Sequence, residues 1–506
     1  MRRNGRAHGL DGRAALSLCA LLLVVCSARA QGSGRLVPKL VLVVVADQMK
    51  AEQLERLAPR FKGALRTLLD SGAVFTEAHH RHVPTQTSVG HAAVLTGRSP
   101  RAHGIVANEW WDREARRVVL AQEDSVHGIG PEQLLSYSLG DALKARTPGS
   151  IVVAASLKSK AAVMLGGKKA DLVLWLDEES RGFATSSYYG PSPAWLGAYN
   201  AGLREPGGIL AGVRNVRGLD EIWRSPKAHR LMADLAGRLL KEYRLGQDSA
   251  PDLLALGFSG TDDVGHRYGP DSRQMEENLL ALDSALAELL GALTARLVKE
   301  DLLVLFTSDH GVMPVPESPA GKALGARRID PKRFEAEVEA ALQLVYPAPQ
   351  GKLVDHLRVP HLYLNRSLAE SRGYDWPVLL KDAARSISAL AGVAEVFTAA
   401  ALEGSEVRGS SSPYAAVYRA SCLPSRSGDL LIRPKEDFLF GREGTSHSTP
   451  YRYDTHVPLI FWGIGVKAGS FPAPARITDA APTLAALLGV ELKAEKDGRV
   501  LAEILE

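Results

Sequence analysis

The sequence predicts an α/β fold in which a mostly parallel central sheet carries helices on both faces. Apolar runs of strand length show no polar alternation, which is typical of strands buried on both sides. Stretches with a helical period separate these runs, as the crossovers of a parallel sheet require. The 506 residues suffice for one large α/β unit with insertions, or for two to three domains.

The chain opens with basic residues and an apolar run. Arginines within the first 13 residues precede ALSLCALLLVV, and Ala-Arg-Ala follows at 28–30. This order predicts a signal peptide over 1–30, cleaved near Ala30, and export to the periplasm or the medium. The apolar run is short for a membrane span. A lipoprotein attached through Cys26 is the weaker alternative, because Val25 stands where a small residue is usual.

The charge balance after cleavage excludes some partners. Residues 1–30 hold five of the 61 basic and one of the 57 acidic residues, so the remaining chain carries no net charge. We therefore expect no nucleic-acid partner and no anionic membrane partner. Cys422 is the one cysteine outside the leader, so no disulfide is expected. We also expect no membrane span in the rest of the chain.

Six apolar runs are the expected strands of the central sheet. They lie at 39–47, 150–156, 170–176, 251–259, 301–309 and 457–463. Helical periodicity predicts helices at 51–70, 272–299 and 478–489. The segments 100–149 and 178–225 contain Trp, Tyr, Gly and Pro, and we expect long loops there.

Residues 314–443 differ in composition from the rest of the chain, and this difference predicts an insertion. They contain a Pro-rich start at 314–319, a helix near 331–345, a strand at 360–364, a helix near 376–391 and GSEVRGSSSP at 404–413. We expect this region to form a cap on a core made of residues 36–313 and 444–506.

Residue types that bind metals stand close to several strand ends. They are Asp47, Asp262, His266, Asp309, His310 and His447. We expect them to converge, because the carboxyl ends of parallel strands meet at one edge of a sheet. Three Asp and three His suit two zinc-like ions, and such a pair can clamp both oxygens of an in-line displacement. A single Asp at a strand end is more simply a cap or turn residue, so the prediction of a metal site depends on all six residues together.

These motifs resemble the alkaline phosphatase superfamily. The nearest likeness is to the single-Thr, di-zinc phosphatases related to the type I nucleotide pyrophosphatase/phosphodiesterases. It runs from about residue 38 to the C-terminus and rests on AD at 46–47, PTQTSVGHAAVLTG at 84–97, HGIVANEWW at 103–111, TDDVGH at 261–266, SDHG at 308–311 and GTSH at 444–447. The resemblance implies an alkaline phosphatase-like fold, two Zn²⁺ and a small-molecule phosphate ester as substrate.

The resemblance also implies roles for individual residues. Thr87 would be the nucleophile, bound to metal and forming a phospho-threonine, and Asn108 would donate a hydrogen bond to a phosphoryl oxygen. One zinc would be held by Asp47, Asp309 and His310, and the other by Asp262, His266 and His447.

Physical chemistry supports a nucleophilic role for Thr87. A threonine hydroxyl attacks poorly unless a metal lowers its pKa, and amides at a helix start favour phosphoryl charge. The simpler reading of Thr87 as a helix N-cap is compatible with this role. Thr85 and Ser88 are expected to be structural neighbours. His91 and His456 are further candidates, more simply read as supporting groups than as ligands.

The pair Lys158 and Lys160 bears on which ester is cleaved. It resembles the K-x-R segment of the single-Thr phosphomonoesterases, which the diesterases lack, and would bind phosphoryl oxygens with Asn108. Lys160 stands where that pattern has Arg, and a lysine supplies a point charge instead of a planar fork. We expect a zinc-dependent alkaline phosphatase acting on phosphate monoesters. The alternatives are a phosphodiesterase or nucleotide pyrophosphatase, and a non-catalytic exported protein that binds metal or phosphate.

Overall fold

The computed structural model describes Met1 and residues 37–404, 412–492 and 497–506. The expected signal peptide and most of the GSEVRGSSSP stretch lie outside the described residues. Residues 37–506 form one compact unit. Within the described part of the chain, no helix combines the length and the hydropathy that crossing a membrane requires.

A nine-stranded sheet occupies the centre of this unit. Its strand order is β10 (Gly182–Ala184), β9 (Leu172–Asp177), β8 (Val152–Ser156), β11 (Asp252–Phe258), β1 (Leu40–Ala46), β12 (Leu302–Thr307), β19 (Leu459–Gly463), β2 (Ala73–Phe75) and β20 (Gly469–Phe471). The five neighbours from β9 to β12 run parallel to one another. Strands β10 and β19 join this block antiparallel. The predicted α/β class with a mostly parallel sheet is confirmed.

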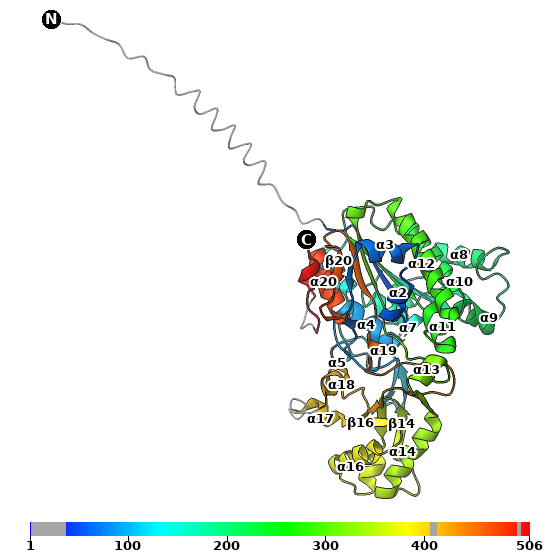
Figure 1. Cartoon of the computed structure of the whole chain (residues 1–506), viewed down its shortest axis with the longest axis vertical. Helices are drawn as coiled ribbons and strands as arrows, with labels where there is room; N and C mark the ends of the chain where they lie inside the picture. The colour runs from blue at the N-terminus through cyan, green and yellow to red at the C-terminus, as the bar shows by residue number, and fades with distance from the viewer. Residues whose placement is uncertain (2–36, 405–411, 493–496) are drawn as a thin grey trace. The chain divides into compact units, whose positions relative to one another are not determined.

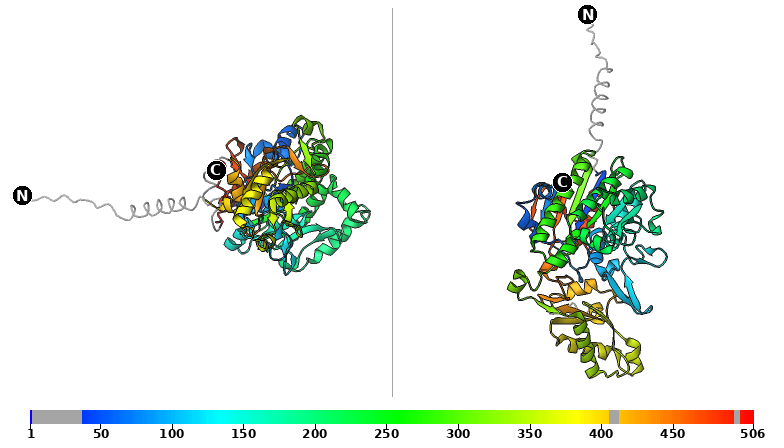
Figure 2. Two further views of the ribbon diagram at one scale, coloured as in Figure 1. Left: turned by 90° about the horizontal axis from the view of Figure 1, so that it is seen from below. Right: turned by 90° about the vertical axis from the view of Figure 1, so that its right-hand side faces the viewer.

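Helices cover both faces, because successive side chains of each strand point in opposite directions. In β1, Val41, Val43 and Val45 belong to one apolar cluster, whereas Leu40 and Leu42 belong to the other. The first cluster includes side chains of α4 (Thr87–Thr96), α6 (Leu139–Arg146), α7 (Ser159–Gly166) and α20 (Ala480–Leu488). The second includes side chains of α2 (Ala51–Leu57), α3 (Ala64–Ser71), α10 (Lys227–Glu242) and α12 (Arg273–Thr294). Figures 1 and 2 show the sheet between these two sets of helices.

The six predicted strands are all present, with ends shifted by up to two residues. Three further strands, β10, β2 and β20, were not predicted, since three residues are too few to show a period. The expected loops at 100–149 and 178–225 in fact contain short elements. These include α5 (Pro100–His103), β4 (Glu109–Asp112), β5 (Arg117–Leu120), α8 (Ala194–Arg204) and α9 (Val216–Trp223).

The single helix predicted at 51–70 is wrong, because two helices, α2 and α3, occupy this range. Proline lacks the amide hydrogen that a helix interior uses, and Pro59 follows the end of α2. Gly63 then precedes α3 as its cap residue. The buried carboxylate of Asp283 in α12 accepts hydrogen bonds from the amides of Lys62, Gly63 and Leu65, at 2.9, 2.7 and 2.7 Å. A distant carboxylate therefore stabilises the break.

A second, antiparallel sheet comes from the predicted insertion. Its order is β14 (Val354–Arg358), β15 (His361–Leu364), β17 (Leu430–Pro434) and β16 (Val393–Thr398). Helices α14 (Pro331–Val345) and α16 (Trp376–Ser388) lie beside it in Figure 1 and share an apolar cluster with it through Phe334, Leu379 and Leu430. The boundaries at 314 and 443 stay a prediction.

Candidate functional site

The predicted metal-binding residues meet at the carboxyl edge of the central strands. Asp47 follows β1, and Asp309 follows β12 by two residues. Asp262 lies in the first turn of α11 (Gly260–Tyr268), directly after β11. His447 precedes β19, which begins at this same edge because it runs antiparallel to β12. Topology thus brings together residues that are up to 400 positions apart in the chain.

Two neighbouring groups of donor atoms result. In the group of Asp47, Asp309 and His310, and likewise in that of Asp262, His266 and His447, one atom from each residue lies within 4.8 Å of the others. His310 Nε2 is 3.6 Å from Asp47 Oδ1 and 3.5 Å from Asp309 Oδ2. His266 Nε2 is 3.2 Å from Asp262 Oδ1. The rings of His310 and His447 stack at 3.7 Å, so the two groups adjoin.

The three histidines share one orientation. Each Nδ1 lies against a backbone carbonyl oxygen, and these are Thr445 at 2.7 Å for His266, Gly311 at 3.0 Å for His310 and Thr85 at 2.5 Å for His447. A carbonyl can only accept, so Nδ1 carries the proton and Nε2 presents a lone pair to the carboxylates. Burial lowers the pKa of His310 and of His447, which favours the neutral ring. Metal-binding histidines are held in this way.

The first group fits a divalent metal ion. Asp47, Asp309 and His310 are fully buried. Among the described residues, Asp47 Oδ1 and His310 Nε2 have no hydrogen-bond partner, whereas Asp309 Oδ2 lies 3.1 Å from His91 Nδ1. Burial, together with the carboxylates of Asp262 and Asp309, raises the pKa of Asp47. Acceptor atoms that converge without donors are stabilised by a cation, and mixed imidazole and carboxylate sets suit zinc.

Lys158 lies between the two groups instead of above the cavity. Its ammonium nitrogen is 2.9 Å from Asp47 Oδ2 and also contacts Asp262 Oδ2. Burial opposes its charge, but the carboxylates of Asp262 and Asp47 raise the Lys158 pKa well above its usual range. Burial and the neighbouring Lys158 lower the pKa of Lys160. The two lysines thus occupy different surroundings, with Lys158 as the link between the carboxylates.

Thr87 is the first residue of α4, and the preceding residue, Gln86, takes the cap position. The reading of Thr87 as an N-cap is therefore wrong. The amide of Ser88 donates to Asn108 Oδ1 at 2.8 Å, and the amide of Asn108 donates to Gln86 Oε1 at 2.8 Å. These two bonds fix Asn108 beside the start of α4.

A cavity of about 550 Å³ opens over this region. Its lining includes the predicted residues Thr87, Asn108, Lys160, Asp262, His266 and His447. Of the three hydroxyl residues in PTQTS, only Thr87 belongs to the lining, at 2% exposure, whereas Thr85 and Ser88 are fully buried. The structure therefore separates three hydroxyls that the local sequence leaves equivalent.

Gln48 supports the site and was missed from the sequence. Its amide donates to Asp309 Oδ1 at 3.0 Å, and its Nε2 donates to Asp262 Oδ1 at 2.5 Å. It adopts φ +68°, which is uncommon outside glycine, and which aims backbone and side chain at both groups. Its position directly after Asp47 was the only available signal. His91 has the supporting place expected of it, with Nδ1 2.9 Å from the Thr87 carbonyl and 3.1 Å from Asp309 Oδ2.

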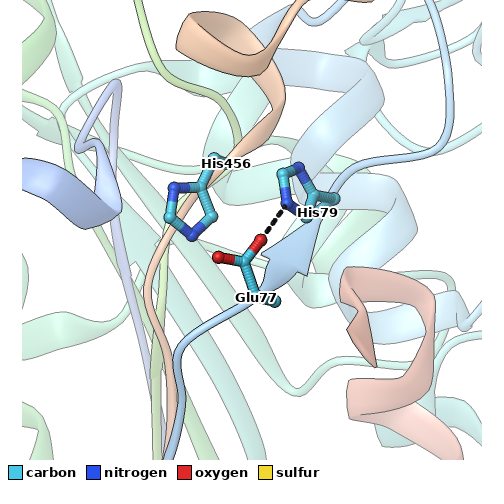
Figure 3. A group of neighbouring side chains, drawn as sticks. All are labelled: Glu77, His79 and His456. Atoms are coloured by element: carbon cyan, nitrogen blue, oxygen red, sulfur yellow. Dashed lines mark hydrogen bonds and ion pairs between the residues drawn. The ribbon is translucent and has the colours of Figure 1, made fainter. Parts of the chain in front are cut away.

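A third cluster of Glu77, His79 and His456 resembles a metal site but is unsuited to one (Figure 3). Both ring nitrogens of His456 are engaged, with Glu52 Oε1 at 2.9 Å and the Thr76 carbonyl at 2.8 Å. The Arg452 guanidinium lies 2.8 Å from Glu77 Oε2 and 3.5 Å from His79 Nε2. A resident cation beside the donor atoms opposes a second one. This cluster is an ion-pair network.

Comparison with known proteins gives a consistent picture. The family model for type I phosphodiesterase / nucleotide pyrophosphatase matches residues 41–454. The chain is similar to the alkaline phosphatase PafA of Elizabethkingia meningoseptica, with 27% identity over 92% of this chain and 94% of the relative. It is similar also to the alkaline phosphatase PhoK of a Sphingomonas species, with 29% identity over 92% of this chain and 91% of the relative.

A solved structure supports the same relationship. The crystal structure of wild-type alkaline phosphatase PafA superposes with a TM-score of 0.84 and 25% identity, covering 93% of this chain and 99% of that one. With the fold, the two donor groups and the family match in agreement, the chain belongs to the type I phosphodiesterase / nucleotide pyrophosphatase family.

Proposed function

We propose that this protein is an exported, zinc-dependent alkaline phosphatase that hydrolyses phosphate monoesters through a phospho-threonine on Thr87. The observation that carries the proposal is the adjacency of two Asp/His donor groups to a cavity that Thr87 lines. The names of the relatives support the monoesterase assignment. The signal peptide predicted at 1–30 supports export.

Each donor group would hold one zinc ion, Asp47, Asp309 and His310 the first and Asp262, His266 and His447 the second. When bound, the two ions supply positive charge that lowers the pKa of the Thr87 hydroxyl and stabilises the attacking and leaving oxygens. The Nδ1 hydrogen bonds keep the three imidazoles oriented, and Gln48 holds a carboxylate of each group in place.

Thr87 performs the covalent step. Its oxygen attacks phosphorus in line, the phosphorus–oxygen bond of the ester breaks, and the alcohol leaves with a proton. Water then attacks the phospho-threonine, which releases inorganic phosphate and restores the hydroxyl. The amides at the N-terminus of α4 and the side chain of Asn108 favour the phosphoryl oxygens during both steps.

Lys158 and Lys160 favour a monoester over a diester. A monoester carries more free negative charge, so ammonium groups near the phosphoryl position stabilise its transition state more. Lys160 already lines the cavity. Lys158 contacts Asp47 and Asp262, and binding of metal to those carboxylates would free its ammonium for a phosphoryl oxygen.

Two variants test the proposal. Thr87→Ala should abolish turnover of an aryl phosphate monoester while metal analysis still finds two ions per chain. Turnover that survives this change would contradict the nucleophile. Lys158→Ala should lower kcat/KM for the monoester more than for a matching diester. An equal loss on both substrates, or a wild type faster on the diester, would favour the phosphodiesterase alternative.

A further inference from the structure

The cavity has a second wall that the catalytic chemistry does not use. Besides the polar residues around Thr87 and the insertion's own His356 and Arg358, the lining includes a set of apolar side chains supplied mainly by the insertion. They are Met313, Phe334, Leu357, Val359, Phe438, Leu439 and Phe440. A phosphoryl group is polar and gains nothing from contact with an apolar surface. This wall would therefore face the alcohol part of the substrate.

Three of these seven residues are phenylalanines, and packing contacts hold their rings in place. Phe334 in α14 and Phe440 in β18 (Phe438–Phe440) pack edge to face with centroids 4.8 Å apart. The guanidinium of Arg327, in the paired strand β13 (Arg327–Ile329), lies 5.8 Å from the ring centre of Phe438. Phe438 and Phe440 are half-buried, so part of each ring remains available. Rings that are packed against neighbours and remain partly exposed are preorganised for a ligand.

Contacts between the insertion and the core fix the wall relative to the catalytic residues. The guanidinium of Arg358 forms an ion pair with Glu109, the residue after Asn108. His356, which also lines the cavity, stacks on Trp111 with centroids 5.8 Å apart and planes 11° from parallel. Both contacts join β14 of the insertion to β4 of the core.

The size of the cavity points to a substantial leaving group. About 550 Å³ lies within the range of pockets that enclose whole small molecules, whereas a phosphoryl group needs only the polar part. Phenyl side chains in a pocket favour planar rings in a ligand, which bury area with little loss of conformational freedom.

We infer that the insertion selects phosphate monoesters whose alcohol carries an aromatic ring, with Phe438 and Phe440 as the specificity-determining contacts. This inference rests on the proposed phosphatase function. A ring on the leaving group would lie against these two side chains while the phosphoryl group lies at Thr87. The ring itself could belong to an aryl alcohol or to a nucleoside.

The test compares substrates that share a leaving oxygen but differ in the ring. Adenosine 5′-monophosphate is paired with ribose 5-phosphate, and benzyl phosphate with ethyl phosphate, so that intrinsic reactivity is closely matched within each pair. The metal-loaded wild type, Phe438→Ala and Phe440→Ala are assayed. Leu344→Ala is the matched control, because Leu344 lies in the same insertion at 86% exposure and outside the cavity lining.

The wild type should prefer the ring-bearing member of a pair in kcat/KM. Each Phe variant should lower that preference about tenfold, the scale of losing an apolar contact in a pocket. Turnover of ribose 5-phosphate and ethyl phosphate and inhibition by inorganic phosphate should stay unchanged, which shows that the variants fold and bind phosphate. The pair whose preference falls more identifies the ring as aryl or nucleobase.

Three results would overturn the inference. They are a wild-type preference near one in both pairs, a preference that neither Phe variant changes, and an equal loss on ribose 5-phosphate and ethyl phosphate. A wild type that hydrolyses none of the four esters refutes the proposed function instead, so the two failures are distinguishable.

Discussion

Replacing Gly90 with alanine should damage both stability and catalysis. Gly90 lies in α4, one turn after Thr87, where the helix passes the end of β12. A β-carbon built on Gly90 would lie 2.1 Å from the carbonyl oxygen of Asp309 and 2.7 Å from its Cβ. Both are backbone-fixed atoms, so the helix itself must move by roughly an ångström to restore van der Waals contact.

The expected magnitude has two opposing parts. Alanine is intrinsically better than glycine in a helix by about 1 kcal/mol. Overpacking a buried contact costs about 1–3 kcal/mol, and more where backbone must shift. The net result should be a lower free energy of unfolding. Activity should fall further, since a displacement of about 1 Å between reacting groups can cost about 100-fold in rate.

The assay is denaturant unfolding together with kcat/KM for an aryl phosphate, using Gly237→Ala as the control. Gly237 also lies inside a helix, α10, but an added β-carbon there meets nothing within 4 Å. Gly237→Ala should therefore be neutral or stabilising and fully active. The reasoning is refuted if Gly90→Ala is as stable and as active as the control.

Three further outcomes are expected. Asp283→Ala should destabilise the fold by about 3 kcal/mol, since three backbone amides lose their acceptor at about 1 kcal/mol each; a change below about 0.5 kcal/mol in urea unfolding would contradict this. Burial raises the pKa of Asp454 to about 7, so the native state binds the extra proton and the free energy of unfolding should fall as pH rises from about 4 to about 7. Asp454→Asn should remove that part of the pH dependence, and unfolding profiles that stay parallel to wild type would count against it. Chelation should abolish activity and lower Tm, with both restored by zinc; a fully active metal-free protein would exclude the metal site.

The sequence predicted the central fold because its signals are strong and local. Runs such as LVLVVVA have no polar position and can only be buried on both faces, and Asp47, Asp262 and Asp309 stand within four residues of the strand ends. Parallel topology then brings the ends together without any further information. The three-residue strand β2 carries no such pattern. The break between α2 and α3 has local signals in Pro59 and Gly63, but Asp283, which stabilises it, lies more than 200 residues away.

The fine structure of the site depended on tertiary contacts. The placement of Lys158 between Asp47 and Asp262 could not be foreseen, because a lysine after a strand can extend in many directions. Glutamine is not a residue type that indicates a role in a metal site, so Gln48 could not be identified from the sequence. The aromatic wall comes from α14 and β18 of the insertion, and no local period indicates that β18 pairs with β13. Its position over the cavity follows from contacts with the core.

The most direct test of the account is to identify the residue that becomes phosphorylated. The metal-loaded protein is mixed with a phosphate monoester, quenched in acid during turnover and digested for peptide mass spectrometry. The account predicts one phosphoryl group on Thr87, and none in Thr87→Ala. Turnover without a phosphorylated peptide, or a phosphoryl group on Thr85 or Ser88, would contradict it.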